Sequence, residues 1–241
     1  MIASAHLHGL LLENPLFAGL TLKESDKAAL QSLGFIPKRF QARTELTREL
    51  DTGGHRTLII HSGWTCVQRF MADGERQIID FPIAGDILGL GHGGHAPPLP
   101  VTAVTEVVIF ESTSMVGAGG ATLTPTLSQI FMGAFGRREA IAGERLTSLG
   151  RRSALARTAH LLLELGARQS LSNGRIEDFE CPLTQYDLAD ALGLTPIHVN
   201  RMLRELREDS LLSFRQGEVE FLDLPGLIGL ADFDDGYLSR R

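Results

Sequence analysis

The chain has 241 residues, of which 43% are hydrophobic and 22% are charged, with a formal net charge of −6. This composition is that of a globular protein and excludes a disordered chain. It also excludes a membrane-spanning helix, since no stretch reaches the roughly 20 apolar residues that a bilayer requires. Two cysteines far apart form no disulfide framework, and the N-terminus lacks the basic opening of a secretory signal. We therefore expect a cytoplasmic protein of two domains, with no membrane partner.

The first half of the chain predicts short helices followed by an antiparallel β-barrel. Helical stretches are expected from Asn14 and over 23–33, after which the pattern becomes alternating and rich in β-branched residues. The expected strands are 39–46, 57–61, 64–71, 76–81 and 101–110, and Asp73-Gly74 forms a hairpin turn within this series. Short strands at regular spacing predict a small barrel or jelly roll, which we place at 1–124. The glycine-rich segment 89–100 is expected to be a loop.

A long helix is expected from Pro125 to about Leu149, because proline suits the first turn of a helix. Its place between the two predicted domains makes 125–150 a candidate dimerisation helix. The alternative is that it packs on its own barrel, since glycines and arginines interrupt its heptad pattern. A second helix, over 153–169, opens a C-terminal domain that we place at 151–241.

The segment 184–206 has the pattern of a helix-turn-helix. Thr184, with an acidic residue three positions later, is typical of a helix start, and Gly193 suits the left-handed residue that ends a helix. Thr195 precedes a proline at the first position of a second helix, expected over 195–206. Two short helices joined by a glycine turn form the unit that places a recognition helix in the major groove of DNA. The alternative is an ordinary helical hairpin with arginines on its surface.

Side chains on the exposed faces of these helices are the candidate DNA contacts. Arg201 can donate two hydrogen bonds to guanine, and Asn200 can pair with adenine or reach a phosphate. Residues at helix starts suit phosphates, which position a protein without specifying sequence. The predicted DNA-binding residues are Thr184, Gln185, Thr195, His198, Asn200, Arg201 and Arg204. Strands on either side of Gln216-Gly217 predict a wing beside these helices.

Several segments together resemble the Crp/Fnr superfamily of bacterial transcription regulators. They are Leu58–Trp64, Met71–Ile78, Pro82–Gly89, Leu183–Thr195 and His198–Arg201. The resemblance implies an α+β fold with a cyclic-nucleotide-binding-like jelly roll, a long dimer helix and a winged helix-turn-helix. It also implies a homodimer that binds double-stranded DNA at two-fold-symmetric operators and works with RNA polymerase. The family's guanine-reading arginine falls on Arg201, whereas its usual glutamate falls on Ile197, which cannot accept a hydrogen bond from cytosine.

The sequence argues against two of the signals that such a barrel could sense, a cyclic nucleotide and an iron–sulfur cluster. Family members that bind cyclic nucleotides have a Gly-Glu pair followed by an arginine that neutralises the phosphate. Gly85 and Asp86 occupy the pair here and are the candidate effector-pocket residues. No Lys or Arg lies over 86–106, so we expect no tight binding of cyclic AMP. An iron–sulfur cluster would need four cysteines and is excluded within one subunit, so we expect no cofactor and no metal.

A glycine-rich segment and a cysteine are two further candidate motifs. Glycines 89, 91 and 94 match a dinucleotide-binding pattern, but the following Ala-Pro-Pro leaves no helix start to hold a pyrophosphate, and His92 and His95 are expected to be surface-loop residues. Cys181 is a redox candidate, because an oxidised sulfur near DNA would repel phosphates. The alternative is an inert, half-buried cysteine, since no Lys or Arg stands near it to lower its pKa.

The sequence is compatible with three classes of function. The favoured one is a DNA-binding transcription regulator that is not an enzyme. The second is a ligand-binding regulatory module that acts through protein partners without binding DNA. The third, an enzyme that uses the Gly/His-rich loop, is disfavoured because no paired carboxylates, nucleophile–base pair or phosphate-binding lysine motif can be placed on a scaffold.

Overall fold

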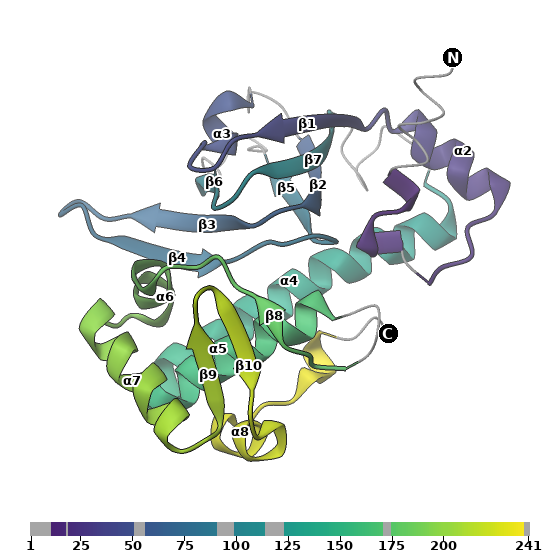
Figure 1. The fold of residues 1–241 in the computed structure, drawn as a ribbon. Coiled ribbons are helices and arrows are strands. Elements are labelled where there is room, and N and C mark those ends of the chain that lie inside the picture. The colour runs from purple at the N-terminus through teal and green to yellow at the C-terminus, as the bar shows by residue number, and fades with distance from the viewer. Residues whose placement is uncertain are drawn as a thin grey trace. The chain divides into compact units, whose positions relative to one another are not determined.

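The computed structural model describes residues 11–17, 19–50, 56–90, 99–113, 123–170 and 175–238. The chain forms two compact units. The N-terminal unit comprises 1–68 and 81–136, and the C-terminal unit comprises 69–80 and 137–241. Figure 1 draws the elements of both units. Among the helices within the described ranges, none combines the length and the apolar character needed to cross a bilayer.

The N-terminal unit is built on antiparallel strands, which confirms the predicted β architecture of an α+β chain. Four strands form a sheet in the order β1-β7-β2-β5, and β3 pairs with β6. The strands are β1 (Ile36–Phe40), β2 (Arg56–Ser62), β3 (Thr65–Phe70), β5 (Ile87–Leu90), β6 (Val101–Ala103) and β7 (Val107–Ser112). The helices are η1 (Pro15–Phe17), α2 (Glu24–Ser32) and α3 (Leu46–Glu49). Alternate strand residues such as Leu58, Ile60 and Ile109 are fully buried in one core cluster.

Three expectations for this unit were wrong. The strand predicted over 39–46 ends at Phe40, because Arg43 adopts a positive φ of 68° in a turn and Leu46 begins α3. The strand predicted over 101–110 is two strands, β6 and β7. Gly89, predicted to begin a loop, pairs within β5 opposite Thr57, and a Cβ there would lie 3.7 Å from the Phe135 ring. The remainder of that loop, with His92 and His95, lies outside the described residues.

Within the described residues, the C-terminal unit combines six helical segments with a hairpin strand and a small sheet. Its elements are β4 (Arg76–Asp80), the second half of α4 (Pro125–Arg151), α5 (Ala154–Gln169), β8 (Phe179–Glu180), α6 (Gln185–Leu192), α7 (Pro196–Glu208), β9 (Leu212–Arg215), β10 (Glu218–Phe221), α8 (Leu224–Ala231) and η2 (Asp235–Tyr237). Three strands pair in the order β8-β10-β9. Helix α4 confirms the long helix predicted from Pro125, whereas β8 and α8 were missed.

Buried charges connect α5 to its neighbours in the C-terminal unit. Glu164 is fully buried and lies 2.8 Å from Arg145 of α4 and 3.1 Å from Arg168 of its own helix. The hydroxyl of Tyr237 donates to the other oxygen of Glu164 at 3.0 Å. Arg168 in turn lies 3.1 Å from Asp80 at the end of β4. Because a buried charge that loses its partner is strongly destabilising, this network holds α5, the helix on which α7 packs.

Candidate nucleic-acid interface

Helices α6 and α7 begin at side-chain caps. The Thr184 hydroxyl accepts a hydrogen bond from the amide of Asp187 at 3.2 Å, and the Asp187 carboxylate accepts one from the Thr184 amide at 3.0 Å. Gly193 ends α6 with a φ of 59°. The Thr195 hydroxyl then accepts from the amide of His198 at 3.2 Å, with Pro196 at the first helical position. Both helix starts therefore form as the sequence predicts.

Helix α7 has one buried face and one face directed to solvent. The buried residues are spaced three and four apart, as a helix packed along one side requires, and are Val199, Met202, Leu203 and Leu206. The exposed residues have the same spacing and are Ile197, Asn200, Arg201, Arg204, Glu205 and Glu208. The Arg201 guanidinium is thus on the solvent side, where a partner could reach it.

Three contacts organise the exposed polar side chains. The Asn200 amide donates to the Gln185 carbonyl oxygen at 2.6 Å, which joins the start of α6 to α7. The Arg201 guanidinium lies 2.7 Å from Nε2 of His198. Arg204 donates to Glu208 at 2.7 Å, and this hydrogen bond raises the pKa of the arginine. Arg201 is therefore held beside a ring nitrogen, whereas Arg204 is already paired with a carboxylate.

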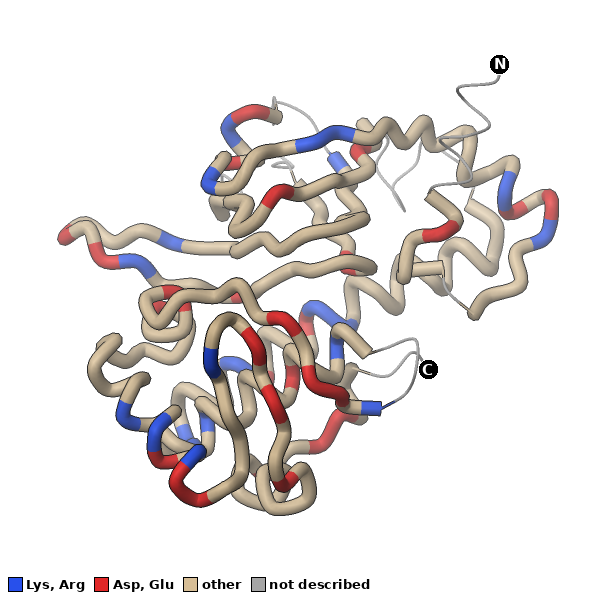
Figure 2. Tube along the Cα trace, in the orientation of Figure 1, with Lys and Arg blue, Asp and Glu red and all other residues tan. Residues whose placement is uncertain are grey.

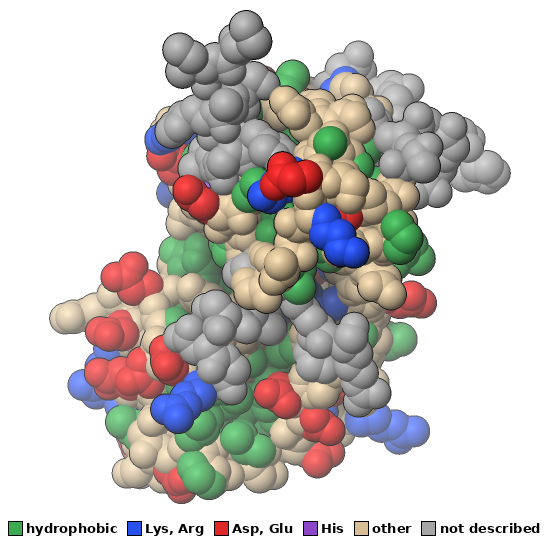
Figure 3. All heavy atoms as spheres, turned by 90° about the vertical axis from the view of Figure 1, so that its right-hand side faces the viewer, with side chains coloured by type: hydrophobic (Ala, Val, Ile, Leu, Met, Phe, Trp, Pro, Cys, Tyr) green, Lys and Arg blue, Asp and Glu red, His purple; other side chains and the backbone are tan. Residues whose placement is uncertain are grey.

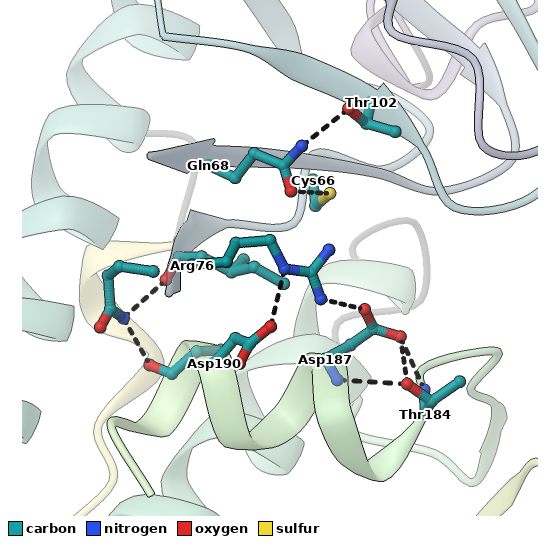
Figure 4. A network of polar contacts seen from close by, with 10 residues as sticks. Cys66, Gln68, Arg76, Thr102, Thr184, Asp187 and Asp190 are labelled. Carbon is teal, nitrogen blue, oxygen red and sulfur yellow. Dashed lines mark hydrogen bonds and ion pairs between the residues drawn. The ribbon is translucent and has the colours of Figure 1, made fainter. Parts of the chain in front are cut away.

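The first residue of β4 contacts α6. Arg76 donates to Asp190 at 2.7 Å and to Asp187 at 2.9 Å, and Figure 4 shows its guanidinium directed at both carboxylates while Asp187 also contacts Thr184. Asp187 thus both caps α6 and binds the arginine at the start of β4. An open groove of about 700 Å³ borders these residues and is also lined by Thr195 and His198, which leaves the start of α7 reachable.

The wing is a tight hairpin with an acidic sheet face. Gln216 and Gly217, at its turn, have φ values of 55° and 81°, as a two-residue hairpin turn requires. Glu218 lies directly opposite Glu180 in the β8–β10 register. Figure 2 shows acidic residues along β8 and β10, and acidic side chains predominate on the face of the C-terminal unit seen in Figure 3. Because phosphates repel carboxylates, the acidic strands β8 and β10 are less suited to DNA than the exposed faces of α6 and α7.

The candidate effector-pocket residues, Gly85 and Asp86, and the redox candidate, Cys181, are all packed against other parts of the chain. Gly85 adopts a φ of 90°, and a Cβ there would lie 2.9 Å from Pro15. Asp86 is buried and accepts a hydrogen bond from the amide of Ile83 at 2.9 Å. Cys181 is only 1% exposed, and burial raises its pKa to about 12. Since the thiolate is the oxidisable form, this burial argues against the redox role of Cys181.

Comparison with known proteins agrees with this geometry. Residues 156–230 match the Crp-like helix-turn-helix domain family. The nitrogen fixation regulation protein FixK of Rhizobium meliloti is 29% identical over 157 residues, which cover 65% of this chain and 68% of that protein. The transcriptional activator protein FnrA of Stutzerimonas stutzeri is 27% identical over 218 residues, covering 88% and 87%. Residues 156–230 therefore form a Crp-like helix-turn-helix domain, and the chain as a whole is similar to regulators of the Crp/Fnr family. Its relatives named here are regulators rather than enzymes.

A solved structure has a similar fold. FixK2 of Bradyrhizobium japonicum is similar with a TM-score of 0.65 and 22% identity, covering 81% of this chain and 96% of that one. Within the described residues, His, Cys, Asp and Glu side chains gather in no cluster that could hold a metal ion.

One exposed residue beside the predicted DNA contacts was missed by the sequence prediction. Tyr186, in the first turn of α6, is 69% exposed, and the signal was available because it is a large side chain outside the buried spacing of its helix. Ile197, which the sequence placed at the family's glutamate position, is 83% exposed in the first turn of α7. Arg76 was also missed, since it lies 111 residues before Asp187 and only folding brings the two together.

Proposed function

We propose that this Crp/Fnr regulator binds DNA by placing the start of α7 in the major groove, as a homodimer on a two-fold-symmetric operator. The observation that carries the proposal is the outward guanidinium of Arg201 on a capped helix whose opposite face is buried. Such a helix can approach base edges without exposing its own core. On this proposal the chain works in the cytoplasm beside RNA polymerase and is not an enzyme.

The proposed roles follow from position and hydrogen-bonding capacity. Arg201 reads guanine through two donors, and His198 aligns it. Asn200 acts together with Gln185, its partner in the free protein, on adenine or on a phosphate. Thr184 and Thr195 lie at helix starts, where backbone amides and the helix dipole favour a phosphate. Arg204 contributes charge along the backbone of the duplex.

The proposed homodimer rests on helix α4. Its buried residues Leu127, Phe131 and Ala134 belong to the core of the N-terminal unit, so the helix does pack on its own barrel. Its opposite side nevertheless exposes Met132 and Leu146, which are 67% and 74% exposed. Exposed glycines between these two residues would allow a second helix to approach closely. These features support 125–150 as a dimerisation helix between a sensor domain at 1–124 and a DNA-binding domain at 151–241.

Selection of duplexes from a random pool by the purified full-length protein tests the proposal. We expect enrichment of a symmetric sequence whose half-sites lie about one helical turn, ~34 Å, apart. The logarithm of the affinity should fall linearly with the logarithm of salt concentration. A regulatory module that acts only through protein partners would enrich nothing. Absence of both enrichment and retardation at low ionic strength would overturn the proposal.

A further inference from the structure

One apolar side chain interrupts an otherwise polar surface. On the exposed face of α7, Ile197 is 83% exposed, and the other exposed members of that face are an asparagine, two arginines and two glutamates. Isoleucine gains nothing from exposure to water, and its β-branch makes it a weaker helix former than the arginines and glutamates around it. Any gain from this side chain must therefore come from a partner that covers it.

The position of Ile197 indicates that this partner is DNA. Ile197 lies in the first turn of α7, four residues and thus one turn before Arg201, so both side chains project from the same side. The rise between them is about 6 Å along the helix axis. If Arg201 reads a base edge, Ile197 meets the same groove within one or two base pairs, which are ~3.4 Å apart.

The chemistry of the groove then identifies what Ile197 contacts. In the major groove, the base edges present hydrogen-bond donors and acceptors and one apolar substituent, the C5-methyl group of thymine. Isoleucine has neither donor nor acceptor. Resting on the proposed function, we propose that Ile197 is a specificity-determining residue that packs on a thymine methyl and so selects T·A at that base pair of each half-site.

Removing only the methyl group tests this contact. In a duplex selected by the wild-type protein, each thymine of the half-site is replaced in turn by deoxyuridine, and the dissociation constants of wild type and Ile197→Ala are measured. At one thymine near the guanine read by Arg201, the wild type should lose about fourfold in affinity, the equivalent of one buried methyl group. Ile197→Ala should bind the thymine duplex more weakly and lose nothing further with deoxyuridine.

Two further variants sharpen the test. Ile197→Glu should shift the preference at that base pair from T·A to C·G, because a carboxylate accepts a hydrogen bond from the cytosine amino group. Leu222→Ala, which truncates an exposed leucine outside α7, should keep the full sensitivity to deoxyuridine. Unchanged melting temperatures establish that the variants are folded.

The outcomes separate the two proposals. If the protein selects an operator but no deoxyuridine substitution has an effect that depends on Ile197, the thymine contact is overturned and the regulator stands. If no duplex is selected, the proposed function falls and the contact falls with it.

Discussion

At the scale of single residues, two neighbouring arginines on α7 differ in what they can offer to DNA. Arg204 must break its 2.7 Å hydrogen bond to the Glu208 carboxylate before it binds a phosphate. Arg201 must break only its contact with the imidazole nitrogen of His198. Arg201→Ala should therefore cost about 1–3 kcal/mol on the selected operator and relax the preference at one base pair. Arg204→Ala should weaken binding less, and equally for all sequences.

Titration of both variants against the selected operator and against a duplex with its guanine replaced measures this difference. Arg201→Ala should bind the two duplexes equally, while Arg204→Ala should still discriminate between them. A uniform loss for Arg201→Ala across sequences would show that this side chain touches only phosphates.

At the scale of elements, the geometry of the helix-turn-helix depends on one backbone conformation. Gly193 has a φ of 59°, and the nearest atom to a Cβ built there is Cδ2 of Leu149 at 3.6 Å, an ordinary contact. The cost of Gly193→Ala is therefore conformational rather than steric, and it should destabilise the C-terminal unit by about 1 kcal/mol. Hydrogen exchange of the α6 and α7 amides should accelerate in this variant. Gly193→Asn should be closer to wild type, since asparagine tolerates the left-handed region, and equal effects of both would contradict this account.

Helix α5 and the C-terminal segment meet at a buried histidine. His160 packs against the ring of Phe233 at 5.1 Å and is stacked on Tyr237 at 6.3 Å. Burial, together with the positive charge of Arg152, lowers the pKa of His160 to about 4, although Glu144 lies 3.3 Å away and acts in the opposite direction. Arg145 lowers this pKa further, and Asp232 raises it.

A pH dependence of stability follows from this environment. The lowered pKa means that the unfolded chain binds a proton first, so stability is complete above about pH 6.5 and is lost as the pH falls toward 4. His160 should cost about 2 kcal/mol of unfolding free energy between pH 7 and pH 5. Urea unfolding at both pH values should show this loss in wild type and a smaller one in His160→Gln. Identical losses would mean that other groups control the acid transition.

The sequence predicted those elements that carry their own local signals. Helix α7 has Thr195 and Pro196 at its start and a regular apolar spacing, and the wing has Gln216-Gly217 at its turn, so both were found. Strand β8 is two residues long and exists only because it pairs with β10, some forty residues later. The hydrogen bond between Asn200 and Gln185 likewise depends on how α6 and α7 pack. Local patterns indicate single elements, whereas contacts distant in sequence appear only once the chain is folded.

At the scale of the whole molecule, net charge and dimerisation together determine the affinity for DNA. The chain has a net charge of −6, and its wing face is acidic, so one DNA-binding surface alone has little electrostatic attraction for a duplex. Linking two such surfaces compensates, because the second half-site is then bound at a high effective concentration. The affinity for a full operator should therefore depend on dimerisation more strongly than on any single phosphate contact.

The exposed side of α4 gives this dependence a test. Leu146 is 74% exposed in the single chain, so Leu146→Glu should leave the fold intact but place a charge in the proposed seam between two helices. We expect sedimentation to change from a dimer to a monomer and operator affinity to fall, while the melting temperature at low protein concentration stays near that of wild type. Leu222→Glu, at an exposed leucine outside α4, should remain dimeric. If both variants sediment as wild type does, the dimer forms through another surface, and the alternative that α4 only packs on its own barrel is favoured.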